Sequence, residues 1–66
     1  MLVIVNGDDT ELPVDSSVDN LVDRLASDRR RIAVARNGEV VPRSVWAQTP
    51  LADGDRVEIL AAVAGG

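Results

Sequence analysis

The stretch that decides the fold is MLVIVNGDDTELPVDSSVDNLVDRLAS (residues 1–27), which joins two strand signals to one helix signal. MLVIV (1–5) is a short apolar run that ends at Asn6-Gly7. Asn-Gly is a strong β-hairpin signal because both residues tolerate a positive φ. TELPV (10–14) is therefore expected to be the returning strand. Pro13 cannot donate a ladder hydrogen bond, so we expect this strand at an edge of the sheet.

The second half of this stretch, SSVDNLVDRLAS (16–27), predicts an amphipathic helix. Either Ser16 or Ser17 is expected to cap its first turn. Five apolar residues recur at the spacing of one helical face, and we expect them to pack against a sheet: Val18, Leu21, Val22, Leu25 and Ala26.

The remaining residues predict three more strands, separated by turn signals and one helical turn. In chain order these segments are IAVA (32–35), the hairpin turn Asn37-Gly38, EVV (39–41), the helical turn and loop RSVWAQTP (43–50), the tight turn Asp53-Gly54-Asp55 and RVEIL (56–60). A hairpin followed by a crossover helix can place the first and last strands side by side and parallel in the middle of one sheet. The sequence therefore predicts an α+β fold, the ubiquitin-like β-grasp, with a mixed sheet of about five strands packed on one main α-helix. We expect this domain over residues 1–60 and a flexible C-terminal tail over residues 61–66.

The composition excludes most kinds of site. The chain has no Cys and no His, and its seven basic residues are all Arg. The commonest general base and the thiolate and imidazole metal ligands are therefore missing. A net charge of −4 argues against nucleic acid as a partner. No apolar run approaches membrane-spanning length and no signal-peptide pattern opens the chain, so we expect a cytoplasmic protein that is monomeric when free.

The polar motifs are better explained as turns and caps than as sites. Asp8-Asp9 and Asp53-Gly54-Asp55 lack the spaced carboxylates of a calcium loop. The serines, among them Ser44, have no His partner that would activate a nucleophile. Trp46 is expected to fill the core, with a ligand platform as the alternative. We therefore expect no metal site, no bound cofactor and no catalytic residue, which is the pattern of a protein that is not an enzyme.

A possible docking surface comes from the first strand, in which both faces are apolar although a sheet covered on one side should alternate. If Met1, Val3 and Val5 face the helix, their neighbours face outward. The predicted apolar patch for a protein partner consists of Leu2, Ile4, Ala33, Ala35 and Leu60. The alternative is that a small domain simply exposes some apolar surface.

The chain finishes on AAVAGG (61–66), a strip with almost no side chains. Fully extended, it spans roughly 20 Å, which is enough to thread into a deep cleft of another protein. Gly65 and Gly66 lack Cβ, so they can pass a constriction and let chemistry approach the last carbonyl. We predict that the Gly66 carboxylate is the reactive group after an enzyme activates it, and that Val63, Ala64 and Gly65 are recognised by the partner enzymes. The alternative is an idle tail.

Over essentially its whole length the sequence resembles the ThiS family, the sulfur carriers of thiamine biosynthesis. The resemblance rests on Val5-Asn6-Gly7 and on residues 36–66, and its most specific elements are Asn37, Val41-Pro42-Arg43, Trp46, Asp53-Gly54-Asp55 and Gly65-Gly66. It implies that a ThiF-type enzyme uses ATP and magnesium to adenylate Gly66. Sulfur from a cysteine-desulfurase-derived persulfide would then convert Gly66 to a thiocarboxylate, from which a ThiG-type thiazole synthase would draw its sulfur. By this reading the chain is a protein cosubstrate.

Three other functions stay open on the sequence. The same chemistry could serve molybdopterin, cysteine or tRNA sulfur transfer. The chain could instead be a modifier whose Gly66 forms isopeptide bonds with lysines of other proteins, although it has no Lys through which to extend itself. The third alternative is a binding domain with an idle tail, whose function would survive removal of Gly65 and Gly66.

Overall fold

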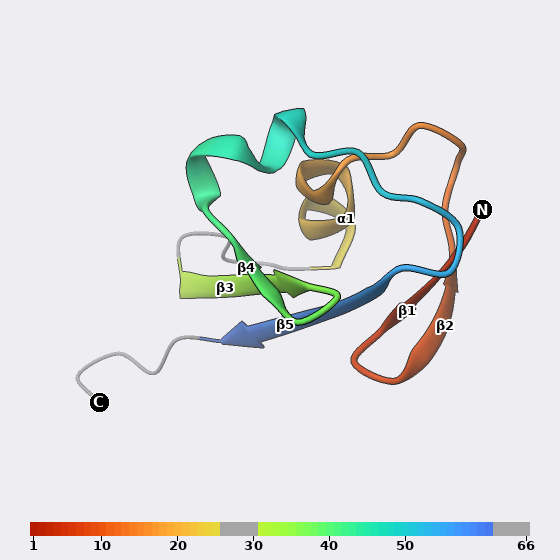
Figure 1. Cartoon of the computed structure of the whole chain (residues 1–66), viewed down its shortest axis with the longest axis horizontal. Coiled ribbons are helices and arrows are strands. Elements are labelled where there is room, and N and C mark those ends of the chain that lie inside the picture. The colour runs from red at the N-terminus through yellow and green to blue at the C-terminus, as the bar shows by residue number, and fades with distance from the viewer. Residues whose placement is uncertain (26–30, 62–66) are drawn as a thin grey trace.

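The computed structural model describes residues 1–25 and 31–61. Its elements are β1 (Leu2–Val5), β2 (Asp8–Glu11), α1 (Val18–Leu25), β3 (Ile32–Arg36), β4 (Glu39–Val41), the 3-10 helix η2 (Arg43–Gln48) and β5 (Arg56–Ala61). Within these residues five strands form one sheet in the order β2-β1-β5-β3-β4. The central pair, β1 and β5, is parallel, and the other neighbours are antiparallel. The helices α1 and η2 lie on one side of the sheet (Figure 1). The predicted β-grasp fold is confirmed.

Both predicted Asn-Gly turns are present as two-residue hairpin loops. Asn6 and Gly7 have φ of 49° and 85°, and Asn37 and Gly38 have φ of 50° and 86°. Two consecutive positive φ values match the twist of the strands on either side.

The prediction for the returning strand, TELPV (10–14), is wrong in its position. The two-residue loop pairs Val5 directly with Asp8, so β2 begins at Asp8 and ends at Glu11. Pro13 lies beyond the strand. Leu12, which follows β2, is buried and donates its backbone N–H to the Met1 carbonyl at 2.8 Å. The loop length, and not the apolar residues, sets where the strand resumes.

The predicted helix is present as α1, and Ser17 caps it. Ser17 Oγ accepts the Asn20 N–H at 3.1 Å, and Asn20 Oδ1 accepts the Ser17 N–H at 2.9 Å. This reciprocal pair is a capping box in which Asn20 stands in the position usually taken by Glu or Gln. Ser16 instead donates its hydroxyl to the Pro13 carbonyl at 2.6 Å. Of the two candidate caps, the structure uses Ser17.

The predicted apolar stripe of α1 is too long by one turn. Val18, Leu21 and Val22 are fully buried, but Leu25 is 52% exposed. Leu25 is the last residue of α1, one turn beyond the residues that contact the sheet. Ala26 and Ser27 lie outside the described residues.

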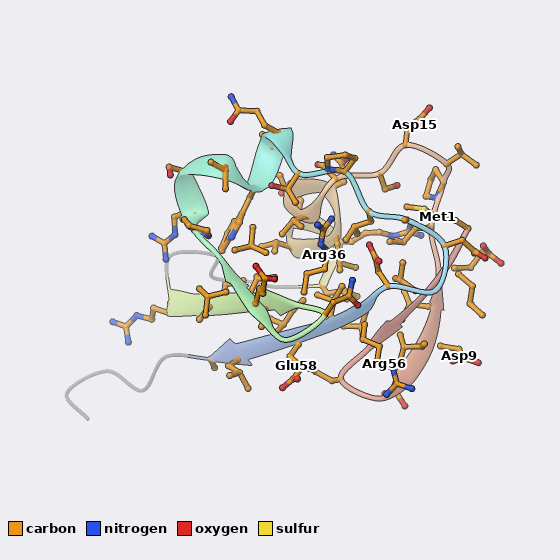
Figure 2. The ribbon with its side chains drawn as sticks, viewed as in Figure 1. Met1, Asp9, Asp15, Arg36, Arg56 and Glu58 are labelled. Atoms are coloured by element: carbon orange, nitrogen blue, oxygen red, sulfur yellow. The ribbon has the colours of Figure 1, made fainter. Side chains whose placement is uncertain are left out.

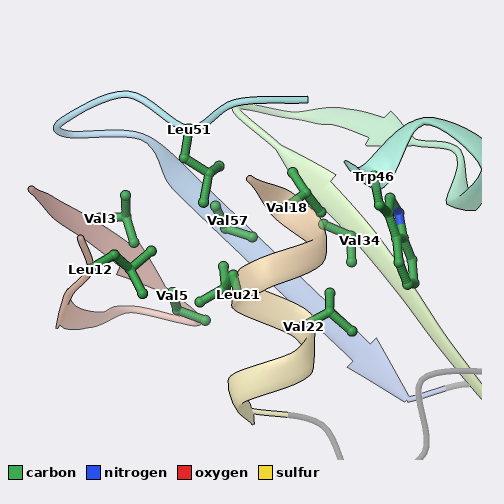
Figure 3. Close-up of a cluster of buried hydrophobic side chains, with 10 residues drawn as sticks. All are labelled: Val3, Val5, Leu12, Val18, Leu21, Val22, Val34, Trp46, Leu51 and Val57. Atoms are coloured by element: carbon green, nitrogen blue, oxygen red, sulfur yellow. The ribbon is translucent and has the colours of Figure 1, made fainter. Parts of the chain in front are cut away.

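One hydrophobic cluster fills the space between the sheet, α1 and η2 (Figure 3). It consists of Val3, Val5, Leu12, Val18, Leu21, Val22, Val34, Trp46, Leu51 and Val57. Trp46 from η2 is 2% exposed, and its indole Nε1–H donates to the Val41 carbonyl at 2.8 Å. The prediction that Trp46 fills the core is confirmed, because its ring is buried and its polar atom has a partner.

Candidate functional site

The predicted reactive residues, Val63, Ala64, Gly65 and Gly66, lie outside the residues that the structure describes. What the structure shows is the strand that leads to them. β5 is the middle strand of the five and runs to Ala61, one residue beyond the predicted strand. The tail therefore follows directly from a strand that has neighbours on both of its sides.

On one side, β5 pairs with β3 from Val57 to its last residue, and the last two pairs are Ala33 with Leu60 and Ile32 with Ala61. On the other side, the parallel pairing with β1 ends where Val5 lies beside Val57. The Asn6 backbone N–H still donates to the Val57 carbonyl at 2.9 Å. β3 thus supports β5 up to the start of the tail, whereas β1 stops short of it.

Beyond Val57 the Asn6 side chain, and not the backbone of β1, makes the hydrogen bonds to β5. The Ile59 N–H donates to Asn6 Oδ1 at 2.9 Å, and Asn6 Nδ2 donates to the Ile59 carbonyl at 3.2 Å. One carboxamide therefore holds both backbone groups of a residue in β5. We call this pair of bonds the Asn6 clamp.

The second Asn-Gly turn holds the other end of β5. The Arg56 N–H donates to Asn37 Oδ1 at 3.0 Å, and Asn37 Nδ2 donates to Asp55 Oδ1 at 3.0 Å. The Asn37 N–H also donates to the Arg56 carbonyl at 2.7 Å. β5 is thus held by an asparagine side chain near each of its ends.

The sheet face opposite α1, which we call the outer face, carries the five residues predicted as an apolar patch. Strand register puts Ala33 opposite Leu60, Ala35 opposite Glu58, and Ile4 beside Arg56. Because paired residues share a face and Val3, Val5 and Val57 are buried in the core, these side chains point away from α1. Figure 2 shows Arg56 and Glu58 projecting from that face and Arg36 from the opposite one. All five predicted residues therefore lie on the outer face.

The patch is not continuous across the sheet. Leu2 and Ile4 lie beside the start of β5, and Leu60 lies four residues after Arg56, roughly 13 Å further along the strand. The charged side chains of Arg56 and Glu58 come between the two groups. Leu60 is 58% exposed and lies next to the tail.

Sequence reasoning missed Val40, which is 76% exposed. It pairs with Ala35 and therefore belongs to the outer face. The segment Glu39-Val40-Val41 was predicted as a strand, but its two successive valines do not show which of them faces outward until the strand register is known.

The acidic turns have structural partners in the backbone. Asp53 Oδ1 accepts the Leu2 N–H at 2.7 Å, and Asp55 Oδ2 accepts the Ala52 N–H at 2.8 Å. Arg36 lies 3.9 Å from Asp55 Oδ2 and donates to the Pro50 carbonyl at 2.8 Å. Asp8 and Asp9 lie exposed in β2. In the part of the chain that is described, no three acidic side chains gather in a way that could hold a metal ion.

No helix within residues 1–25 and 31–61 is long and apolar enough to cross a membrane.

Comparison with known proteins shows which family and which proteins this chain resembles. The model of the ThiS family matches residues 3–66. The chain is 30% identical over 66 residues to the sulfur carrier protein ThiS of Escherichia coli, with all of both chains covered. It is 39% identical over 66 residues to a thiazole synthase of Paramagnetospirillum magneticum, of whose length it spans only 20%.

Among solved structures, the fold is similar to the crystal structure of the thiamine biosynthesis protein ThiS from Geobacter metallireducens. The TM-score is 0.87, the sequences are 32% identical, and each chain is covered completely.

Proposed function

Because this chain belongs to the ThiS family, we propose that it is a sulfur carrier protein in the biosynthesis of the thiazole moiety of thiamine. The observation that carries the proposal is the end-to-end correspondence with the E. coli carrier, which includes the residues up to Gly66. The fold supports it, since the chain leading to Gly66 continues from the central strand of the sheet.

The proposed sulfur-carrying group is the carboxylate of Gly66. A terminal carboxylate is ionised near pH 7, since its pKa is about 3.3–3.7, and it is then a poor electrophile. A ThiF-type enzyme using ATP and magnesium would transfer AMP to this carboxylate and release pyrophosphate. A persulfide sulfur, supplied through a cysteine desulfurase, would attack the acyl carbon and displace AMP. A thiol must then cleave the remaining S–S bond to leave the thiocarboxylate.

The acceptor of this sulfur is proposed to be a ThiG-type thiazole synthase. The thiazole synthase of P. magneticum supports this partner, because that protein contains a segment 39% identical to this whole chain. In this scheme the carrier supplies the sulfur and the partners supply the catalytic groups. Val63, Ala64 and Gly65 would be read by the clefts of both enzymes, and the outer-face residues Leu2, Ile4, Ala33, Ala35 and Leu60 would dock the folded domain.

The test is intact-mass analysis of the carrier after incubation with a ThiF-type enzyme, ATP, magnesium and a persulfide donor. The expected result is a gain equal to the replacement of one oxygen by sulfur, confined to the C-terminal peptide. A variant lacking Gly65 and Gly66 is the control and should gain nothing. No gain in the intact carrier would contradict the proposal, and attachment to lysines of other proteins would favour the modifier instead.

A further inference from the structure

We propose that Asn6 is a positioning residue for the reactive tail: its carboxamide clamps Ile59 and so fixes the base from which the tail starts. Asn6 lies 53 residues before Ile59 in the sequence. The inference deepens the function proposed above. Its prediction for the KM of the carrier rests on that function, whereas its prediction for the order of Ile59 to Ala61 does not.

The Asn6 clamp reproduces bonds that β1 would have made had it continued. In a parallel pair, the bonds are evenly spaced along both strands. Here the Ile4 N–H donates to the Asp55 carbonyl and the Asn6 N–H to the Val57 carbonyl, each at 2.9 Å. The next bonds of the series fall on the N–H and carbonyl of Ile59. The backbone turns away at Asn6, where φ is 49°, and the side-chain carboxamide supplies both.

Asparagine meets the requirements of this position, whereas glycine and aspartate each meet only part of them. Its short side chain carries one acceptor and a donor, and it tolerates the positive φ that the hairpin demands. Glycine would keep the φ but lose both bonds. Aspartate would keep the acceptor for the Ile59 N–H but lose the donor to the Ile59 carbonyl.

The location of the clamp makes it relevant to the tail. Ile59 lies two residues before Ala61, where β5 ends. On the β3 side, Leu60 and Ala61 pair with Ala33 and Ile32. On the β1 side, the clamp is the interaction nearest to the tail among the described residues. Without it, β5 would be held beyond Val57 from one side.

A fixed base should lower the entropic cost of placing the tail in an enzyme cleft. Seating a chain segment in a cleft costs conformational entropy, and preorganisation reduces that cost. Once the tail is seated, the enzyme sets the geometry at Gly66. Loss of the clamp should therefore raise the KM of the carrier for its activating enzyme and leave kcat nearly unchanged.

The chain provides a matched control in Asn37. It occupies the same kind of turn with nearly the same φ, and it also holds β5 through its side chain. Its bonds, however, lie at Arg56 and Asp55, at the far end of β5 from the tail. Asn37→Gly should weaken the fold much as Asn6→Gly does without touching the base of the tail.

The structural arm compares wild type, Asn6→Gly, Asn6→Asp and Asn37→Gly by amide hydrogen exchange and backbone order parameters of the free carrier. We expect exchange at Ile59 to be about tenfold faster in Asn6→Gly, and order parameters to fall at Leu60 and Ala61. Asn37→Gly should increase exchange at Arg56 and leave Ile59 to Ala61 as in wild type. An unchanged Ile59 in Asn6→Gly would overturn the clamp.

The kinetic arm measures thiocarboxylate formation on the same four carriers with one activating enzyme. We expect KM to rise about five- to tenfold in Asn6→Gly relative to Asn37→Gly, and by less in Asn6→Asp, which keeps the acceptor for the Ile59 N–H, with kcat within about twofold. Equal KM values for Asn6→Gly and Asn37→Gly would overturn the positioning role. If the wild-type carrier gains no sulfur, the proposed function fails, and the order parameters at Leu60 and Ala61 still decide whether Asn6 fixes the base of the tail.

Discussion

Leu21 and Leu25 lie one turn apart on α1, yet the structure gives them different roles. Leu21 is fully buried, and Figure 3 shows it inside the hydrophobic cluster, whereas Leu25 is 52% exposed. Replacing a buried Leu by Ala loses the transfer free energy of the removed atoms and leaves a cavity, at a cost of about 2.7–5 kcal/mol. We therefore expect Leu21→Ala to lower the free energy of unfolding by about 3 kcal/mol or more.

That loss is large for a domain of this size. At about 0.05–0.15 kcal/mol per residue, a chain of 66 residues has a total stability of about 3–10 kcal/mol. With a urea m-value of about 1 kcal/mol per molar, the midpoint of unfolding should fall by about 3 M. Leu25→Ala removes a half-exposed side chain and introduces a better helix former, so its cost should stay below about 1 kcal/mol.

Urea titration followed by tryptophan fluorescence measures both variants. Trp46 is the one aromatic residue of the chain and is buried in the cluster, so its emission reports the loss of the core. Equal midpoint shifts for the two variants would refute the assignment of the buried face of α1. A shift larger for Leu25→Ala than for Leu21→Ala would refute it more directly.

Three further changes test other parts of the structure. Leu60→Glu should weaken binding to a partner enzyme by about tenfold or more without moving the urea midpoint, and unchanged affinity in a titration would exclude Leu60 from the interface. Ser17→Ala should cost about 1 kcal/mol because it removes the acceptor of the Asn20 N–H; Ser44→Ala, in the exposed part of η2, is the comparison and should cost less than about 0.5 kcal/mol. Gly54→Ala should cost about 1–2 kcal/mol, because φ is 86° there although a Cβ would meet open space; no change in the thermal midpoint would contradict this.

The parts of the fold that the sequence predicted correctly depend on local rules. Two Asn-Gly pairs predicted both hairpin turns, and one periodic segment between strands predicted the crossover helix. From these, the adjacency of the first and last strands followed. The returning strand was misplaced at TELPV because the length of the hairpin loop, which requires pairing from Asp8, was not used to set where the strand starts. The buried stripe was extended to Leu25 because helical periodicity alone does not show where the helix passes beyond the sheet.

In the candidate site, too, the sequence predicted what depends on local rules and not what depends on the tertiary structure. Alternation along the strands was sufficient to assign Leu2, Ile4, Ala33, Ala35 and Leu60 to one face, but their spacing across that face needs the register. The role of Asn6 at Ile59 was beyond sequence reasoning. Asn6 was already explained by the turn that it starts, and nothing local indicates that its carboxamide contacts a residue 53 positions away. Because the turn alone explains an asparagine at position 6, there was no reason in the sequence to look for its second contact, with Ile59.

Side chains of β5 alternate between the core and the outer face, so this one strand contributes to stability, to the proposed docking surface and to the start of the tail. Val57 is buried in the core, whereas Leu60 is exposed on the outer face. The backbone groups of Arg56 and Ile59 are held by two asparagine side chains, and the strand ends at Ala61, directly before the proposed reactive tail. A change at Val57 should therefore act on stability, a change at Leu60 on partner binding, and a change at Asn6 on the presentation of the tail. Because these effects reach β5 through different atoms, unfolding midpoint, affinity and KM should separate them in variants of β5 and of the turn that holds it.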